Sequence, residues 1–209
     1  MTAETTVPML GMPPRGHRSG SILLFSGHMI DRPERPVPRF PPEMEPRARE
    51  AIAHVLDELD VGSDDIGIFG GACGGDLLFA EVALERGATL EMYLPFEEAR
   101  FLDESVDFAG PAWRQRYRSI RARCSLVDVA TVATARDGLK VDRYAMNNTR
   151  MLAAAGRFGP DRLEFICLWD GRSGDGPGGT QHLMHEVARR QGRTHWIDTN
   201  KLLSTRGMN

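Results

Sequence analysis

The chain has little of what marks several classes of protein. It contains three cysteines in 209 residues, widely spaced, which argues against the disulfide framework of a small secreted domain and suits a reducing cytoplasm. It has no apolar run long enough to span a bilayer, and it does not begin with the charged and then apolar segments of a secretory signal. We therefore expect a cytoplasmic protein without a membrane partner.

A surplus of positive charge is also lacking. The formal net charge is −3, so no overall basic field would attract nucleic acid, and we expect no nucleic-acid partner. The content of 41% hydrophobic and 26% charged residues is ordinary for a globular protein, and the length fits one core. Residues 1–19 are rich in Pro, Gly, Thr and Arg without a period. We expect them to form a disordered tail before a single domain at residues 20–204.

What the chain does contain is an alternation of short apolar runs with amphipathic segments. The apolar runs predict strands at residues 21–25, 66–69, 89–96, 125–130, 163–169 and 194–197. Residues at helical spacing predict helices at 46–60, 76–86, 111–124, 144–155 and 181–190. This order predicts an α/β fold, with a mostly parallel sheet covered by helices on both faces.

The stretch between residues 66 and 81 is dense in glycine and is the first candidate for a ligand-binding turn. A short buried strand, Ile66 to Phe69, is followed by four glycines between Gly70 and Gly75, and a helix begins near Asp76. Glycines remove the β-carbons that would keep a ligand away from the backbone. A helix N-terminus adds unpaired N–H groups and partial positive charge, which suit a phosphate. Taken alone, the stretch also fits an ordinary tight turn that binds nothing.

Glycine follows two other predicted strands as well. Ser26-Gly27-His28 ends the first strand, and a glycine-rich turn from Asp170 to Thr180 follows the strand at 163–169. Ligands of parallel sheets bind beyond the carboxyl ends of the strands, so the three turns are expected at one edge. We therefore expect a phosphate-bearing or otherwise anionic ligand there.

A proline-rich loop at residues 29–46 carries three interleaved arginines, Arg32, Arg35 and Arg39. Prolines stiffen such a loop, and arginines can hold a phosphate or carboxylate with paired donors. The alternative is a solvated loop whose arginines pair with its own acidic residues.

At the glycine turns the chain resembles the SLOG superfamily of Rossmann-like proteins, which includes the DNA-processing protein A family and the Lonely Guy cytokinin-activating enzymes. The resemblance covers about residues 21–200 and lies in two turns, Gly70-Gly71-Ala72-Cys73-Gly74-Gly75-Asp76 with Ala80-Glu81, and Trp169-Asp170-Gly171 with Gly178-Gly179-Thr180. Tyr144 and Asn148 lie where related members carry an aromatic residue and an asparagine. The resemblance implies a Rossmann-like three-layer sandwich and, because members often pair through helices, a homodimer.

The resemblance also implies a nucleotide or nucleotide-derived ligand, with no other cofactor required. Gly178, Gly179 and Thr180 would hold its phosphate, and Asp76 would lie beside the sugar or base, where a carboxylate can accept ribose hydroxyls. Asp76 is alternatively a helix N-terminal residue that satisfies the helix dipole. The full set of candidate ligand contacts is Ser26, Gly27, His28, Arg32, Arg39, Gly71, Ala72, Gly74, Gly75, Asp76, Asn148, Asp170, Gly171, Gly178, Gly179 and Thr180.

The second turn departs from the superfamily members that hydrolyse nucleoside monophosphates. Those enzymes carry a Pro-Gly-Gly-x-Gly-Thr turn followed at once by glutamates, whereas here the turn is the shorter Pro177-Gly178-Gly179-Thr180, and Leu183 stands where a glutamate would be expected. Glu81 and Glu186 are the catalytic candidates that remain. The helix position of Glu81 favours solvation at the edge of the core or a salt bridge.

Metal and thiol chemistry are not expected. His182 and His185 are three residues apart on a predicted helix, but a metal site needs a third ligand at known geometry, and a capping or rim role is favoured. Cys73 lies near a helix start, yet no histidine is adjacent to it in sequence, which favours a small filler residue.

Three functions follow from these patterns. The first is a nucleotide-binding domain that acts as a sensor or regulatory module. The second is a phosphoribohydrolase-type enzyme that cleaves a nucleotide N-glycosidic bond. The third, an interaction module of a DNA-handling complex, is weakened by the slightly acidic charge balance.

Overall fold

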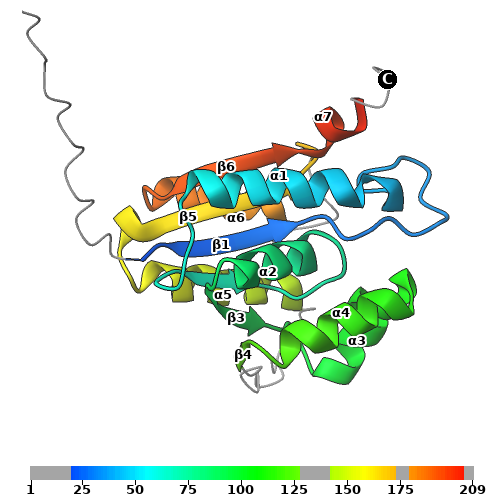
Figure 1. Ribbon diagram of the computed structural model, residues 1–209, viewed down its shortest axis with the longest axis horizontal. Coiled ribbons are helices and arrows are strands. Elements are labelled where there is room, and N and C mark those ends of the chain that lie inside the picture. Colours follow the sequence, from blue (N-terminus) through cyan, green and yellow to red (C-terminus); the bar gives the residue numbers. More distant parts are fainter. Residues whose placement is uncertain (1–19, 128–141, 173–178, 205–209) are drawn as a thin grey trace, which may run out of the picture.

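The protein is described here from a computed structural model that covers residues 20–127, 142–172 and 179–204. Its six strands form one parallel sheet in the order β4-β3-β2-β1-β5-β6 (Figure 1). The strands are β1 (Ile22–Gly27), β2 (Ile66–Phe69), β3 (Thr89–Tyr93), β4 (Ser125–Val127), β5 (Leu163–Trp169) and β6 (Arg193–Asp198). The expected tail at residues 1–19 lies outside the described residues.

Seven α-helices accompany the sheet in the described part of the chain. They are α1 (Glu45–Glu58), α2 (Gly75–Glu85), α3 (Glu98–Ser105), α4 (Pro111–Arg121), α5 (Arg143–Gly156), α6 (Thr180–Arg189) and α7 (Thr199–Ser204). Short 3₁₀ turns are η1 (Pro42–Met44), η2 (Asp107–Ala109) and η3 (Pro160–Arg162). The predicted α/β alternation is confirmed, and the sheet is wholly parallel.

Two buried clusters make the fold a three-layer sandwich. One face of the sheet packs on α1, α2 and α4, where Ala48, Ile52 and Leu56 of α1 recur every four residues and are fully buried. The other face packs on α5 and α6 through residues such as Met151 and Leu183. Figure 1 shows α1 and α2 in front of the sheet and α6 behind it. The Rossmann-like arrangement predicted from the sequence is therefore present.

The strand order places a crevice next to β1. The chain runs outward from β1 through β2 and β3 to β4, and it then returns to β5 on the other side of β1. At such a switch point the helices after neighbouring strands leave in opposite directions, which opens a crevice beyond the carboxyl ends. The turns after β1 and β5 flank this crevice.

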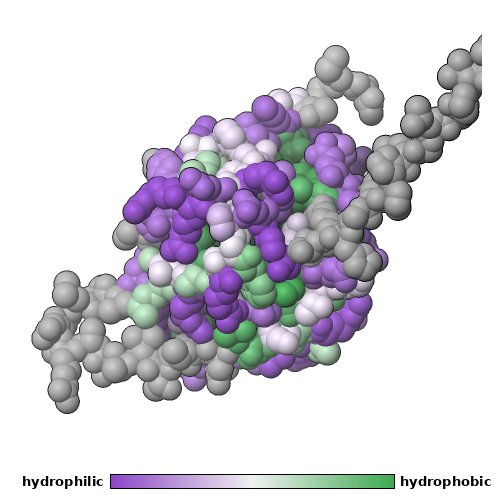
Figure 2. Space-filling view, turned by 90° about the vertical axis from the view of Figure 1, so that its left-hand side faces the viewer, coloured by the Kyte–Doolittle hydropathy of each residue, from purple (hydrophilic) through white to green (hydrophobic). Residues whose placement is uncertain are grey.

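The opposite end of the molecule is seen in Figure 2, from the side of the strands' amino ends. Hydrophilic side chains cover much of this face, with hydrophobic areas between them. Over the described ranges, no helix is both long enough and apolar enough to cross a membrane.

Candidate functional site

A cavity of about 440 Å³ lies at the carboxyl edge of the sheet, beside the switch point. The end of β1, the turn between β2 and α2, the first half of α5 and the start of α6 all line it. The residues from the two predicted glycine turns that reach it are Gly70, Ala72, Asp76, Gly179 and Thr180. The described parts of the turns, far apart in sequence, therefore meet at one edge.

Three helices begin at this cavity, and their first N–H groups have different partners. The helix α5 is capped by Asp142, whose Oδ1 accepts from the N–H groups of Tyr144 and Ala145 at 3.0 and 3.1 Å. Near the start of α2, the Ala72 N–H donates to Oδ2 of Asp76. The N-cap residues of α2 and α6 are both glycines, Gly74 and Gly179, which have no side chain to cap the helix. The Gly75 N–H of α2 donates to the His28 carbonyl, and the N-terminus of α6 can accept an anion from the cavity.

Two hydroxyl groups join the end of β1 to the start of α6. Ser26 Oγ and Thr180 Oγ1 lie 3.0 Å apart in a hydrogen bond, and both residues line the cavity. Either hydroxyl can donate or accept, so the pair can also bind a phosphate oxygen. The α6 end of the cavity thus combines an uncapped helix start with two hydroxyls.

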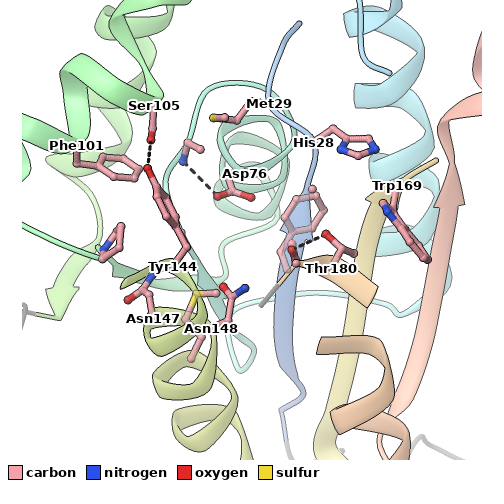
Figure 3. A pocket seen from close by; sticks show the side chains of 18 of the residues that line it. His28, Met29, Asp76, Phe101, Ser105, Tyr144, Asn147, Asn148, Trp169 and Thr180 are labelled. Carbon is pink, nitrogen blue, oxygen red and sulfur yellow. Dashed lines mark hydrogen bonds between the residues drawn. The ribbon is translucent and has the colours of Figure 1, made fainter. Parts of the chain in front are cut away.

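Asp76 is a buried carboxyl group in the middle of the cavity wall, 8% exposed (Figure 3). Burial raises its pKa to about 7, although nearby N–H groups of the glycine turn act in the opposite direction. The carboxyl group receives the Ala72 N–H at 3.2 Å. Asp76 is therefore both a helix N-terminal residue that satisfies backbone donors and a polar group that faces the ligand space.

His28 lies at the end of β1, against the turn that follows β5. Nε2 of His28 lies 3.1 Å from the main-chain nitrogen of Asp170 and 3.2 Å from the Oδ1 atom of the same residue. Burial and the nearby positive charge of Arg39 lower the pKa of His28, and the close Asp170 carboxylate opposes them only partly. The lowered pKa favours the neutral ring, and Asp170 holds its Nε2 atom in place.

The far end of the cavity is aromatic. Phe101 and Tyr144 line it, and the Tyr144 ring meets the Phe96 ring edge-on with centroids 5.6 Å apart. The Tyr144 hydroxyl is hydrogen-bonded to Ser105 Oγ at 3.2 Å, which fixes the ring, while 46% of the residue remains exposed. Figure 3 shows this aromatic end on one side of Asp76 and the end with Thr180 and His28 on the other.

Several predicted contact residues support the turns instead of lining the cavity. Gly74 has a φ of +96°, and a β-carbon there would lie 2.7 Å from the main-chain nitrogen of Ile30. The Gly75 N–H donates to the His28 carbonyl at 3.0 Å. Gly71 packs on Met92, and Gly171 on the Trp196 ring. These glycines let backbone segments approach one another; Gly178 lies outside the described residues.

The proline-rich loop contributes one of its arginines to the site. Arg39 lines the cavity. Arg32 stacks on Phe108, 3.8 Å from its ring centroid, and donates to the Glu104 carbonyl, while Arg35 pairs with Asp31. Arg35 therefore pairs within the loop, as one alternative predicted, and Arg39 is the arginine that lies where it could contact a ligand.

The two catalytic candidates lie away from the cavity. Glu81 follows Asp76 by five residues, which turns it about 140° around α2, and it forms a two-pronged ion pair with Arg116 of α4 at 2.6 Å. Glu186 pairs with Arg189 on the surface of α6. Neither glutamate is among the lining residues. Glu81 therefore forms a salt bridge, which was one of the alternatives to a catalytic role.

Metal and thiol chemistry find no support among the described residues. His182 and His185 are exposed on α6, and no group of three or more potential ligands occurs in the ranges that the structure covers. Cys73 is fully buried, and burial raises its pKa to about 12, so the thiol stays protonated.

Other lining residues were not predicted from the sequence. Asn147 is held by a 2.7 Å hydrogen bond from Nδ2 to the Tyr93 carbonyl, beside the predicted Asn148. Phe101, Ser105 and Met29 approach from segments without a recognisable ligand motif. Only Asp142 had a usable signal, since an aspartate directly before a helical segment is a typical cap.

No protein-family model and no curated protein sequence matches the chain. Among solved structures, it is similar to DNA processing protein A from Streptococcus pneumoniae, with a TM-score of 0.49 and 13% identity over 91% of this chain. The match spans 57% of that protein's length, less than two thirds.

A second similar structure is the Moco carrier protein from Chlamydomonas reinhardtii, with a TM-score of 0.35 and 14% identity over 89% of this chain and 99% of that one. These likenesses concern the fold alone. The chain has a Rossmann-like α/β fold, in which one parallel sheet of six strands lies between helices on both faces.

Proposed function

We propose that the chain binds a nucleotide or nucleotide-derived ligand in the cavity at the carboxyl edge, and acts as a sensor or regulatory module. The observation that carries the proposal is the meeting of the described parts of the two glycine turns in one cavity, where α6 begins after Gly179. The volume of about 440 Å³ lies within the range of roughly 300–1,000 Å³ of small-molecule sites.

The two ends of the cavity suit the two ends of a nucleotide. A phosphate fits the start of α6, where Ser26, Gly179 and Thr180 offer hydroxyl and N–H donors. A planar base fits the other end, where it can stack on Tyr144. The sugar would then lie between them, near Asp76 and Asn148.

Binding without turnover is favoured over N-glycosidic hydrolysis. Both glutamates that would supply a catalytic carboxylate are engaged by arginines outside the cavity. Nε2 of His28 is held against Asp170, so this nitrogen does not offer a ready general base there. The hydrolase remains the alternative, and it requires release of free base from a nucleotide.

The test is a thermal-shift panel of ribonucleoside mono-, di- and triphosphates on the full chain. A ligand at a hundred times its Kd stabilises the folded state by about 2.7 kcal/mol, so a raised Tm without product in a chromatographic assay is expected. We expect Thr180→Val to weaken binding about tenfold, because a hydrogen bond to a charged phosphate oxygen is lost. Thr149→Val, an exposed position on α5 outside the lining, is the matched control. No stabilisation by any nucleotide would contradict the proposal.

A further inference from the structure

The strand β6 is an open edge of the sheet. It is the last strand in the order β4-β3-β2-β1-β5-β6, so within the described chain no strand pairs with its outer side (Figure 1). The outer N–H and C=O groups of such an edge are a template for a further strand. Each of the six residues of β6 pairs with one residue of β5, so no bulge interrupts this edge.

The usual protection of an edge strand is missing from β6. Natural edges are often short, or they carry proline, lysine or an outward charge. The described strand β4, at the other edge, has only three residues, whereas β6 has six and contains neither proline nor lysine. The two basic side chains of β6, Arg193 and His195, both bind Glu164 of β5, which directs them toward the sheet. They therefore do not keep a further strand away from the edge.

An exposed tryptophan lies near the middle of this edge. Trp196 is 51% exposed, although its ring is held in place. Its Nε1 donates to the Trp169 carbonyl at 3.0 Å, and the ring centroids of the two residues lie 5.9 Å apart. A fixed tryptophan with an exposed surface is the type of residue that anchors protein interfaces. The edge therefore combines open backbone groups with an aromatic anchor.

The strand is complementary to a second copy of itself. About a twofold axis through Trp196, two antiparallel copies of β6 place Trp196 opposite Trp196 and Thr194 opposite Asp198. These three residues alternate along β6 and so lie on one face of the sheet, where opposite side chains meet. The two indoles would cover each other, and each Thr194 hydroxyl would meet a carboxylate. A shift by one residue would oppose side chains from different faces, which the pleat does not allow.

We propose that β6 pairs with β6 of a second copy of this chain in the antiparallel sense, which joins two six-stranded sheets into one. The charges fit this occupant, because the strand begins with Arg193 and ends with Asp198. Antiparallel copies bring the basic end of each strand beside the acidic end of the other, whereas parallel copies would align like charges. This surface differs from the helices through which members of the resembled superfamily often pair, and the inference does not depend on the proposed ligand.

Sedimentation equilibrium of the full chain measures the pairing. We expect a monomer–dimer equilibrium at protein concentrations between about 1 and 100 μM. Thr194→Asp should raise the dissociation constant by about tenfold or more, because it places like charges opposite each other twice about the axis. The matched control is Thr194→Lys at the same exposed position. Its charge is opposite to that of Asp198, so it should leave the dissociation constant within about threefold or lower it.

Hydrogen exchange locates the contact, since the main-chain amides on the outer side of β6 should exchange more slowly as the protein concentration rises. A chain that stays monomeric up to about 100 μM would overturn the inference. A dimer that Thr194→Asp leaves unchanged would overturn it too, because the contact then lies on another surface, such as the helices. Equal weakening by both Thr194 variants would also overturn it, since pairing with Asp198 distinguishes their charges. The wild-type result does not depend on whether the variants fold.

Discussion

Burial decides the protonation of single groups in the cavity wall. Burial and the charge of Arg39 lower the pKa of His28 and outweigh the Asp170 carboxylate, which favours the neutral ring. Burial shifts the pKa of Asp76 in the opposite direction, upward, and so also favours the uncharged form of that group. The surroundings therefore shift the pKa of each group away from the ordinary value of its residue type.

Asp76 should make the unligated protein less stable as the pH rises. Its folded pKa of about 7 lies above the ordinary value of 3.8, so between these values the folded state binds more protons than the unfolded state. Stability from this group is complete below pH 4 and is lost as pH rises through 7, by at most about 4 kcal/mol. Urea unfolding at pH 5 and pH 8 checks this.

The comparison that isolates the group is Asp76→Asn, which cannot titrate. Its free energy of unfolding, relative to that of the wild-type chain, should rise between pH 5 and pH 8. A difference between the two proteins that stays constant across this range would show that Asp76 is ionised throughout.

At the scale of elements, the turn between β2 and α2 depends on close backbone approach. Gly74 combines a φ of +96° with main-chain atoms of His28 and Ile30 less than 3 Å from the position of a β-carbon. We expect Gly74→Ala to destabilise the protein by about 2 kcal/mol or more, through backbone strain and overpacking. Gly62→Ala, where a β-carbon meets nothing within 4 Å, is the control and should change stability by less than about 1 kcal/mol. Chemical denaturation of both variants measures the two losses of stability. Equal losses in Gly74→Ala and Gly62→Ala would contradict the close backbone approach at this turn.

The edge strand β6 is tied to β5 by a buried carboxylate. Glu164, fully buried, accepts from Arg193 and His195, both on β6, with His195 Nε2 at 2.8 Å from Oε2. Burial alone would raise the pKa of Glu164, but the hydrogen bonds from His195 and Arg193 lower it to about 2. This contribution to stability is therefore full above about pH 4.5 and is lost as pH falls toward 2.

Glu164→Gln should destabilise the protein by about 3 kcal/mol, because Arg193 and His195 would lose the buried carboxylate that accepts their hydrogen bonds. In the same variant, the main-chain amides of β6 should exchange hydrogen faster than in the wild-type chain. The matched control is Glu186→Gln, whose exposed pair with Arg189 is worth less than about 1 kcal/mol. Similar losses from the two variants would contradict a special role for the β5–β6 ion pairs.

For the whole molecule, the alternation of apolar and amphipathic segments was enough to predict the fold. All six strands formed where short apolar runs stood between turns, and Pro111 opens α4 as expected. The segment before Pro111, which lies between two predicted elements, contains α3, whose Phe101 packs into the core. Short amphipathic helices of this kind carry too few periods to be separated from loops by sequence alone.

The site was harder to predict, because a cavity wall joins segments without local motifs. The glycine turns and Ser26 gave a local signal, so the α6 end of the cavity was found. Phe101 and Ser105 gave none, since they reach the cavity only through the packing of α3. The ion pair of Glu81 could not be predicted from the sequence, because its partner Arg116 is 35 residues away.

The central claim is that the cavity between the glycine turns holds a nucleotide. The most direct test is a crystal structure of the full chain soaked with the nucleotide that raises Tm the most. The account predicts ligand density with the phosphate at Gly179 and Thr180 and the base against Tyr144. Density for the ligand at another surface, with this cavity holding only water, would contradict it.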